Sequence, residues 1–200
     1  MTRATHDPAA RRPRGPEDTW VDGPRGRYWG TFGASGLLLA HPDAGVLLQL
    51  RAVWSHLGGT WGLPGGAIKA HETAEAAALR EADEEAGVPP ELVTVLGTSV
   101  FDLGYWSYTT VLARAEELFT PIIGDAESDD LRWVTFDEVG DLPLHPGLGA
   151  GWPDLRSRLD ELLATEGGAD SAASAAFQAT SPRTTSLGSS ASSAMTSAGT

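Results

Sequence analysis

The segment 80–87 carries a cluster of acidic side chains whose spacing suits a divalent cation. Glu81, Glu84 and Glu85 lie three and four residues apart, so on a helix their carboxylates share one face. Carboxylates near a helix C-terminus face the negative end of the macrodipole, at a cost of roughly 0.3–1 kcal/mol each. Hard cations such as Mg²⁺ take oxygen ligands, typically one or two carboxylates with phosphates and waters. A bound cation would make this arrangement favourable, so we interpret the cluster as a metal site.

The helix that would carry this face has clear start and stop signals. Thr73 is a suitable N-cap, because its hydroxyl can accept a hydrogen bond from the first turn. Gly87 suits the left-handed position that follows the last helical residue, Ala86, and Pro89 comes soon after it. We therefore predict a helix over residues 74–86.

The flanking segments are expected to place a sheet and a loop against this helix. Ala82 and Ala86 belong to the opposite stripe, where small side chains would let a sheet lie close. Gly65 and Gly66 permit the preceding loop to approach the carboxylates. Short apolar runs predict strands at residues 33–40, 46–51, 61–63, 92–101, 105–113 and 131–136, the first two paired as a hairpin, and a last helix from Pro153 to Gly167.

Gly66, Glu72 and the run from Arg80 to Val88 together resemble the Nudix box, Gx5Ex7REUxEExGU. Every fixed position matches, and only Ala82 is smaller than the aliphatic residue usual there. The resemblance implies an α/β fold, a Nudix-type α/β/α sandwich with a mixed sheet, the Nudix loop-helix-loop and a C-terminal helix. It also implies a hydrolase that depends on Mg²⁺ or Mn²⁺.

The resemblance assigns roles to individual residues. Many members of the family carry a further acid before a late strand, which here is Glu127, with Asp129 and Asp130 as rivals. A carboxylate would take the proton from the attacking water, and more than one candidate stays open. The implied catalytic residues are Glu81, Glu84, Glu85 and Glu127; the implied metal ligands are Glu81, Glu84, Glu85 and the Gly65 carbonyl; the residues that orient the box are Gly66, Glu72, Arg80 and Gly87.

Three further residues are candidates for substrate contact. Arg51 ends a predicted strand just before the loop and could bind phosphate, although an ordinary strand-end Arg is an equal alternative. Trp61 could stack on a base, although an aromatic residue in a strand is more often part of the core. Tyr105 lies near the place where dinucleoside polyphosphate hydrolases of the family tend to carry a Tyr.

The expected function is cleavage of the diphosphate linkage in a nucleoside diphosphate derivative, foremost a nucleoside triphosphate in the manner of MutT. Alternatives within the class are ADP-ribose, dinucleoside polyphosphates and nucleotide sugars. A different alternative is a ligand sensor that uses the fold without turnover. The intact box argues against that alternative, because sensors usually have a degraded box.

Composition limits the partners and the domain plan. The formal net charge of -13 over 200 residues disfavours binding of a nucleic-acid polymer. No apolar run is long enough to cross a membrane, and the absence of Cys is compatible with the cytoplasm. A homodimer stays open. We expect a disordered or loosely docked leader over 1–27, a Nudix hydrolase domain over 28–166 and a disordered Ser/Ala/Thr-rich tail over 167–200.

Overall fold

The computed structural model describes residues 15–179, with side chains described up to residue 166. Of the described residues, 15–164 belong to one compact unit, and a second unit begins at Thr165. Within the described residues, no helix combines the length and the apolar character needed to cross a membrane.

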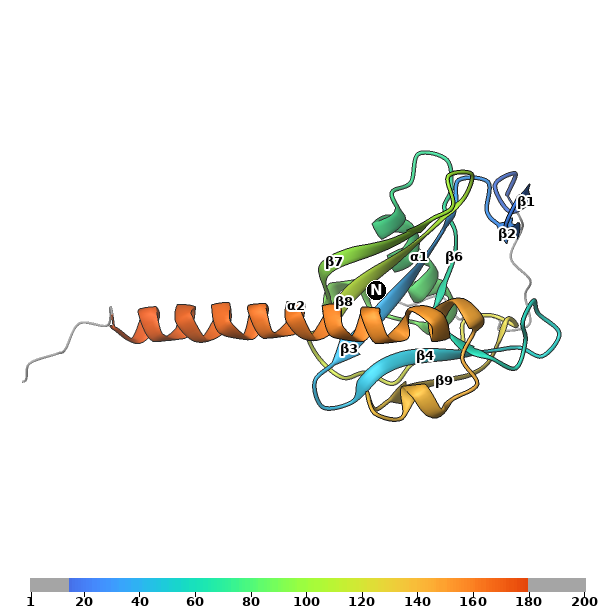
Figure 1. The fold of residues 1–200 in the computed structure, drawn as a ribbon. Helices are drawn as coiled ribbons and strands as arrows, with labels where there is room; N and C mark the ends of the chain where they lie inside the picture. Colours follow the sequence, from blue (N-terminus) through green and yellow to red (C-terminus); the bar gives the residue numbers. More distant parts are fainter. Residues whose placement is uncertain (1–14, 180–200) are drawn as a thin grey trace, which may run out of the picture. The chain divides into compact units, whose positions relative to one another are not determined.

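A mixed seven-stranded sheet forms the centre of the first unit (Figure 1). Its main path runs β5-β4-β3-β8-β7, with β6 paired to β3 and β9 paired to β4. The β3–β8 pair is parallel and the other pairs are antiparallel, which confirms the expected mixed sheet. The strands are β3 (Ala34–His41), β4 (Gly45–Arg51), β5 (Trp61–Gly62), β6 (Gly65–Ala67), β7 (Val93–Asp102), β8 (Ser107–Ala115) and β9 (Ser128–Val134).

The strands β3 and β4 form the expected hairpin but pair only at its closed end, where Ala40 lies opposite Val46. Further from the turn, β6 takes the place beside β3, with Gly65 opposite Gly36. A Cβ atom on Gly65 would lie 2.3 Å from the Ser35 carbonyl oxygen, so only glycine permits this approach. The segment predicted as a loop is therefore partly a strand, held inside the sheet.

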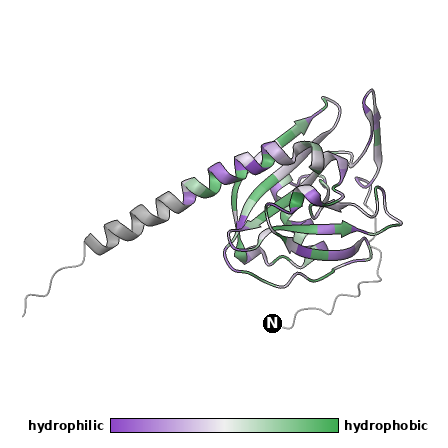
Figure 2. Cartoon of the chain, turned by 60° about the horizontal axis from the view of Figure 1, so that its bottom comes forward, coloured by the Kyte–Doolittle hydropathy of each residue, from purple (hydrophilic) through white to green (hydrophobic). Residues whose placement is uncertain are grey.

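Two helices cover opposite faces of the sheet (Figure 1). Helix α1 (Ala74–Ala86) buries its alanine stripe against Leu37, Leu39 and Leu47. The first turns of α2 (Pro146–Ala179) cover the other face through residues such as Trp152. The strands between the helices are coloured mainly as apolar in Figure 2, as expected for strands buried on both faces.

The last helix begins seven residues before the predicted start at Pro153. Pro146 occupies its first position, where the missing N–H group costs nothing, and the imidazole Nδ1 of His145 accepts a hydrogen bond from the Gly147 N–H group at 3.1 Å. Pro153 is tolerated within the helix, and the predicted end at Gly167 was also wrong, because α2 continues to Ala179. The tail prediction therefore fails for residues 167–179, and residues 180–200 lie outside the described part.

A second, two-stranded sheet precedes the main one. Strands β1 (Trp20–Gly23) and β2 (Gly26–Trp29) form an antiparallel hairpin in which Trp20 lies opposite Trp29. Regular structure therefore begins at Trp20, ahead of residue 28, where the hydrolase domain was expected to start. Long-range contacts of the tryptophans hold this hairpin, as described below. Residues 1–14, the rest of the predicted leader, lie outside the described part.

Candidate metal centre and active site

Helix α1 has the bounds that its caps predict. The Thr73 hydroxyl accepts a hydrogen bond from the Ala76 N–H group at 3.1 Å. Gly87 adopts the left-handed conformation with φ 64°, and its N–H group donates to the Asp83 carbonyl at 3.0 Å. Its last turn contains no basic residue, so the helix positions its acidic residues without a cationic cap.

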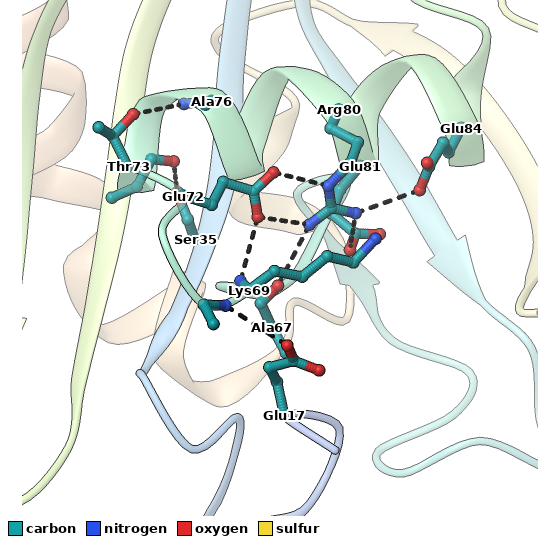
Figure 3. Close-up of polar contacts among 12 residues, drawn as sticks. Glu17, Ser35, Ala67, Lys69, Glu72, Thr73, Ala76, Arg80, Glu81 and Glu84 are labelled. Atoms are coloured by element: carbon teal, nitrogen blue, oxygen red, sulfur yellow. Dashed lines mark hydrogen bonds and ion pairs between the residues drawn. The ribbon is translucent and has the colours of Figure 1, made fainter. Parts of the chain in front are cut away.

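An ion pair ties α1 to the loop that precedes it (Figure 3). Arg80 donates from Nε to Glu72 Oε1 at 2.7 Å and from Nη2 to Glu72 Oε2 at 2.9 Å. Arg80 Nη2 also donates to the Ala67 carbonyl, and the Lys69 N–H group donates to Glu72. The hydrogen bonds from Arg80 lower the pKa of Glu72, and Glu72 in turn raises the pKa of Arg80. Both groups are therefore charged, and together they fix the loop against the helix.

The remaining donor of Arg80 reaches the acidic face. Its Nη1 contacts Glu81 at 2.5 Å and Glu84 at 3.2 Å (Figure 3). Glu81 is only 8% exposed, and a Cβ atom on Gly66 would lie 2.7 Å from its carboxylate carbon. Glu85 is 6% exposed and accepts a hydrogen bond from the Gly65 N–H group at 2.9 Å. Gly66 thus makes room for the nearly buried Glu81 carboxylate, and Gly65 donates to the nearly buried Glu85 carboxylate.

This set of donors fits a hard divalent cation by its chemistry. It consists of carboxylate oxygens on one helix face, two of which share the single guanidinium of Arg80. As placed, however, no three acidic or histidine side chains of residues 15–166 converge closely enough to hold an ion. A cation would replace the hydrogen bonds from Arg80 to Glu81 and Glu84, while Glu72 would keep Arg80 in position.

The segment before β9 lies against the C-terminal end of α1. The Gly124 N–H group donates to the Glu85 carbonyl at 2.9 Å, and the Ile122 N–H group donates to the Ala86 carbonyl at 3.0 Å. Glu127 follows this segment directly; its side chain is exposed, and its carbonyl accepts from the Ala52 N–H group at 2.8 Å. Glu127 thus lies between the end of β4 and the segment that covers the acidic helix end.

The two rivals of Glu127 are engaged elsewhere. Asp129 accepts a hydrogen bond from the Val53 N–H group at 3.1 Å. Asp130 forms an ion pair with Arg132 at 2.7 Å. Both belong to β9, whereas Glu127 precedes it.

The three predicted substrate contacts have different surroundings. Arg51 ends β4, is partly exposed and donates from Nε to the His56 carbonyl at 3.1 Å. Trp61 is 4% exposed, packs in the core and has the Arg132 guanidinium 4.3 Å from its ring centre. Tyr105 donates to the Gly26 carbonyl at 3.3 Å and accepts from the Arg25 N–H group at 3.2 Å, so its hydroxyl is engaged by the β1–β2 hairpin. Of the three, Arg51 alone is neither packed in the core nor engaged by the β1–β2 hairpin.

Tyr108, which no local sequence pattern marks, lies close to Glu85 and Arg51. Its hydroxyl lies over Gly36, where a Cβ atom would be 2.1 Å away. Burial raises the pKa of Tyr108, the Glu85 carboxylate raises it further, and Arg51 opposes them. The phenol is therefore a neutral hydrogen-bond donor close to both charges. The parallel register of β8 on β3, which no local pattern reveals, places it there.

Comparison with known proteins gives one family for this arrangement. The family model of the NUDIX domain matches residues 31–153. A Mycobacterium tuberculosis protein named "Putative 8-oxo-dGTP diphosphatase 3" is 51% identical over 155 residues, which cover 72% of this chain and 71% of that protein. A Bifidobacterium longum "Nucleoside triphosphate pyrophosphatase/Nudix hydrolase fusion protein" is 44% identical over 76% of this chain and 33% of its own length.

Solved structures show the same fold. A Nudix hydrolase from M. smegmatis, RenU, is 50% identical with a TM-score of 0.64, covering 74% of this chain and 96% of that one. An Ap4A hydrolase from C. elegans is 22% identical with a TM-score of 0.54, covering 66% of this chain and 98% of that one. The second likeness shows the fold alone.

Proposed function

The chain belongs to the Nudix family and is a hydrolase of phosphoric anhydride bonds, and on this premise we propose that it is a Mg²⁺-dependent nucleoside triphosphate pyrophosphohydrolase. The observation that carries the proposal is the acidic face of α1. Every acidic position of the box on this face carries a carboxylate. Arg80, which pairs with Glu72 of the loop, also contacts Glu81 and Glu84. Members of this family generally depend on a divalent metal.

The proposed ligands are Glu81, Glu84, Glu85 and the Gly65 carbonyl, with Mn²⁺ as a substitute for Mg²⁺. When bound, the ion would neutralise the diphosphate and lower the pKa of a bound water. The Gly65 N–H group donates to the Glu85 carboxylate at 2.9 Å, so the backbone of Gly65 lies against one of the other proposed ligands. The roles of Gly66 and Gly87 are structural: Gly66 makes room for Glu81, and Gly87 ends the helix.

The proton of the attacking water would pass to a carboxylate of this site, with Glu84, Glu85 and Glu127 as the candidates. Glu127 is proposed because it is exposed beside the covered end of α1. Arg51 is proposed to contact a phosphate, since its guanidinium is partly exposed and lies close enough to influence Tyr108. Trp61 and Tyr105 are withdrawn as substrate contacts because the core and the β1–β2 hairpin engage them.

A nucleoside triphosphate is proposed as the substrate because the relative from M. tuberculosis is named for 8-oxo-dGTP and the relative from B. longum for nucleoside triphosphates. ADP-ribose, dinucleoside polyphosphates and nucleotide sugars are the alternatives within the family. The partner is accordingly a small nucleotide, and we place the enzyme in the cytoplasm. The non-catalytic sensor is not favoured, because each acidic position of the box is filled.

The experiment is a substrate panel with purified protein and millimolar Mg²⁺. It contains dGTP, 8-oxo-dGTP, ATP, ADP-ribose and diadenosine tetraphosphate, and both products of each reaction are quantified. We expect pyrophosphate and a nucleoside monophosphate from at least one triphosphate, with no product in the presence of EDTA. Turnover of ADP-ribose or diadenosine tetraphosphate alone would replace the proposed substrate class. If no substrate gives a product, the proposal of a nucleotide pyrophosphohydrolase is overturned.

A further inference from the structure

The β1–β2 hairpin contacts the loop that follows Arg51. The ring of Trp20 meets the ring of His56 edge-on, with 5.1 Å between the ring centres and 78° between the planes. The ring of Trp29 packs against the ring of Trp20, with 5.2 Å between the ring centres. The Arg27 guanidinium lies 5.3 Å from the ring centre of Trp20. Trp20 is therefore held on the hairpin while it supports an exposed residue of another segment.

The loop with His56 in turn surrounds Arg51. Arg51 Nε donates to the His56 carbonyl at 3.1 Å, which fixes the base of the guanidinium. The backbone of Arg51 is bound on both sides, by the Thr60 carbonyl at 3.0 Å and the Gly59 N–H group at 2.8 Å. The position of the guanidinium thus depends on the conformation of the loop 52–60.

This loop is held partly by its own hydrogen bonds and partly by contacts with other segments. The Ser55 N–H group donates to the Ala52 carbonyl at 2.8 Å, and the Gly58 N–H group donates to the Ser55 carbonyl at 3.0 Å. Val53 and Trp54 are nevertheless 77% and 52% exposed, and Leu57 has a positive φ of 56°, which is unfavourable for a residue with a Cβ atom. Its hydrogen bonds to the rest of the protein include Ala52 to Glu127, beside the site. A contact from outside the loop, such as the ring of Trp20, is well placed to restrict it.

The hairpin can give this support because it is anchored on its other side. Trp106 Nε1 donates to the Trp29 carbonyl at 3.0 Å, and the ring of Trp106 stacks on Tyr28 at 4.5 Å. Tyr105 adds two hydrogen bonds to the backbone of the hairpin turn. These contacts come from the β7–β8 connection, so the hairpin joins that connection to the loop 52–60.

We propose that Trp20 is a positioning residue for substrate binding: through His56 it holds the loop 52–60, and thereby the Arg51 guanidinium, in place for the phosphates of a nucleoside triphosphate. The inference rests on the proposed function. It gives the N-terminal hairpin, which precedes the matched NUDIX region, a part in substrate binding. Trp20 acts through other residues, so it should affect binding of the substrate and leave the chemical step alone.

The test measures steady-state kinetics of the full chain with dGTP and 8-oxo-dGTP as probes. We expect Trp20→Ala to raise KM by roughly three- to tenfold, the effect of losing an aromatic pair, with kcat within about twofold of wild type. His56→Ala should do the same, and because His56 is exposed this variant should fold normally. The double variant should be no worse than the stronger single variant, because both break one contact. Trp20→Phe should restore most of the affinity.

Asp22→Ala is the matched control, since it breaks the exposed ion pair with Arg27 in the same hairpin but leaves Trp20 and His56 in contact. Its KM should equal that of wild type. Suppose that the wild type is active and that Trp20→Ala and His56→Ala fold but keep its KM. That result overturns this inference and leaves the proposed function standing. Fully additive effects of the two changes have the same consequence. A wild type that hydrolyses no triphosphate overturns the proposed function and the inference with it.

Discussion

Arg80 donates two parallel hydrogen bonds of 2.7 and 2.9 Å to the Glu72 carboxylate, and the side chains of Arg80 and Glu72 are only 20% and 15% exposed. Such bidentate pairs are strong, and the loss of one partner leaves a charge in a place shielded from water. We expect Glu72→Ala to lower the free energy of unfolding by about 3 kcal/mol, near the lower end for a buried pair. Urea denaturation without metal measures this.

Asp160→Asn is the control for that measurement. It removes an exposed ion pair with Arg156, one turn apart on α2. An exposed pair of this kind contributes about 0.3–0.5 kcal/mol. Equal losses for Glu72→Ala and Asp160→Asn would mean that the Arg80–Glu72 pair does not tie the loop to the helix.

Added Mg²⁺ should raise the melting temperature. A ligand that binds only the folded state at 100 times its Kd adds about 2.7 kcal/mol, which for a domain of this size amounts to roughly 5–10 °C. Glu84→Gln should reduce this rise and lower kcat at least about 100-fold, while its melting temperature without metal stays near that of wild type. Differential scanning fluorimetry with and without Mg²⁺ provides the comparison, and an equal rise in both proteins would exclude Glu84 as a ligand.

Three glycine-to-alanine changes should separate folding from metal binding. Gly65→Ala places a methyl group against the backbone of β3, so the whole domain should be destabilised. Gly66→Ala pushes instead on the end of the Glu81 side chain, so metal affinity and activity should fall more than stability. Gly140→Ala, with no atom within 4 Å, should change stability by less than about 0.5 kcal/mol. Unfolding curves and Mg²⁺ titrations of the three variants decide this, and a Gly66→Ala protein with normal metal binding would contradict it.

Acidification should weaken the start of α2. Burial lowers the pKa of His145, and the positive charge of Arg51 adds to this effect. Because the ordinary value is 6.5, the unfolded chain takes up the proton first as the pH falls. The stability contributed by neutral His145 is therefore complete above pH 6.5 and is lost below it, up to roughly 0.5–2 kcal/mol for a helix cap.

His145→Asn keeps a capping acceptor but does not titrate. Its unfolding free energy should fall less than that of wild type between pH 7 and pH 5, and urea curves at both values show the difference. Parallel pH profiles of the two proteins would mean that Nδ1 of His145 does not cap the helix.

The parts of the fold that the sequence predicts well depend on local signals. Helix α1 follows its prediction because Thr73 and Gly87 act within one turn of its ends. The hairpin of β3 and β4 follows from a turn between two apolar runs. In contrast, the β1–β2 hairpin depends on partners far along the chain, such as His56 and Trp106.

The same distinction applies to the site. The spacing of the acids on α1 is local, so their common face is readable from the sequence. The burial of Trp61 and the place of Tyr108 depend on which strands pair and on which helix covers each face. The residue type alone does not decide between core and site, so Trp61 was left open between a substrate contact and the core, and Tyr108 was missed.

The hydrogen bonds from Ile122 and Gly124 to the last carbonyls of α1 have a kinetic consequence. A free helix end frays one residue at a time, but this end cannot loosen unless the covering segment detaches with it. We expect hydrogen exchange of both amides to report one common free energy of opening, as for a single opening unit. The acidic residues of α1 and Glu127 would then become ordered or disordered together. The protein would therefore alternate between a state with the whole site formed and a state with no part of it formed.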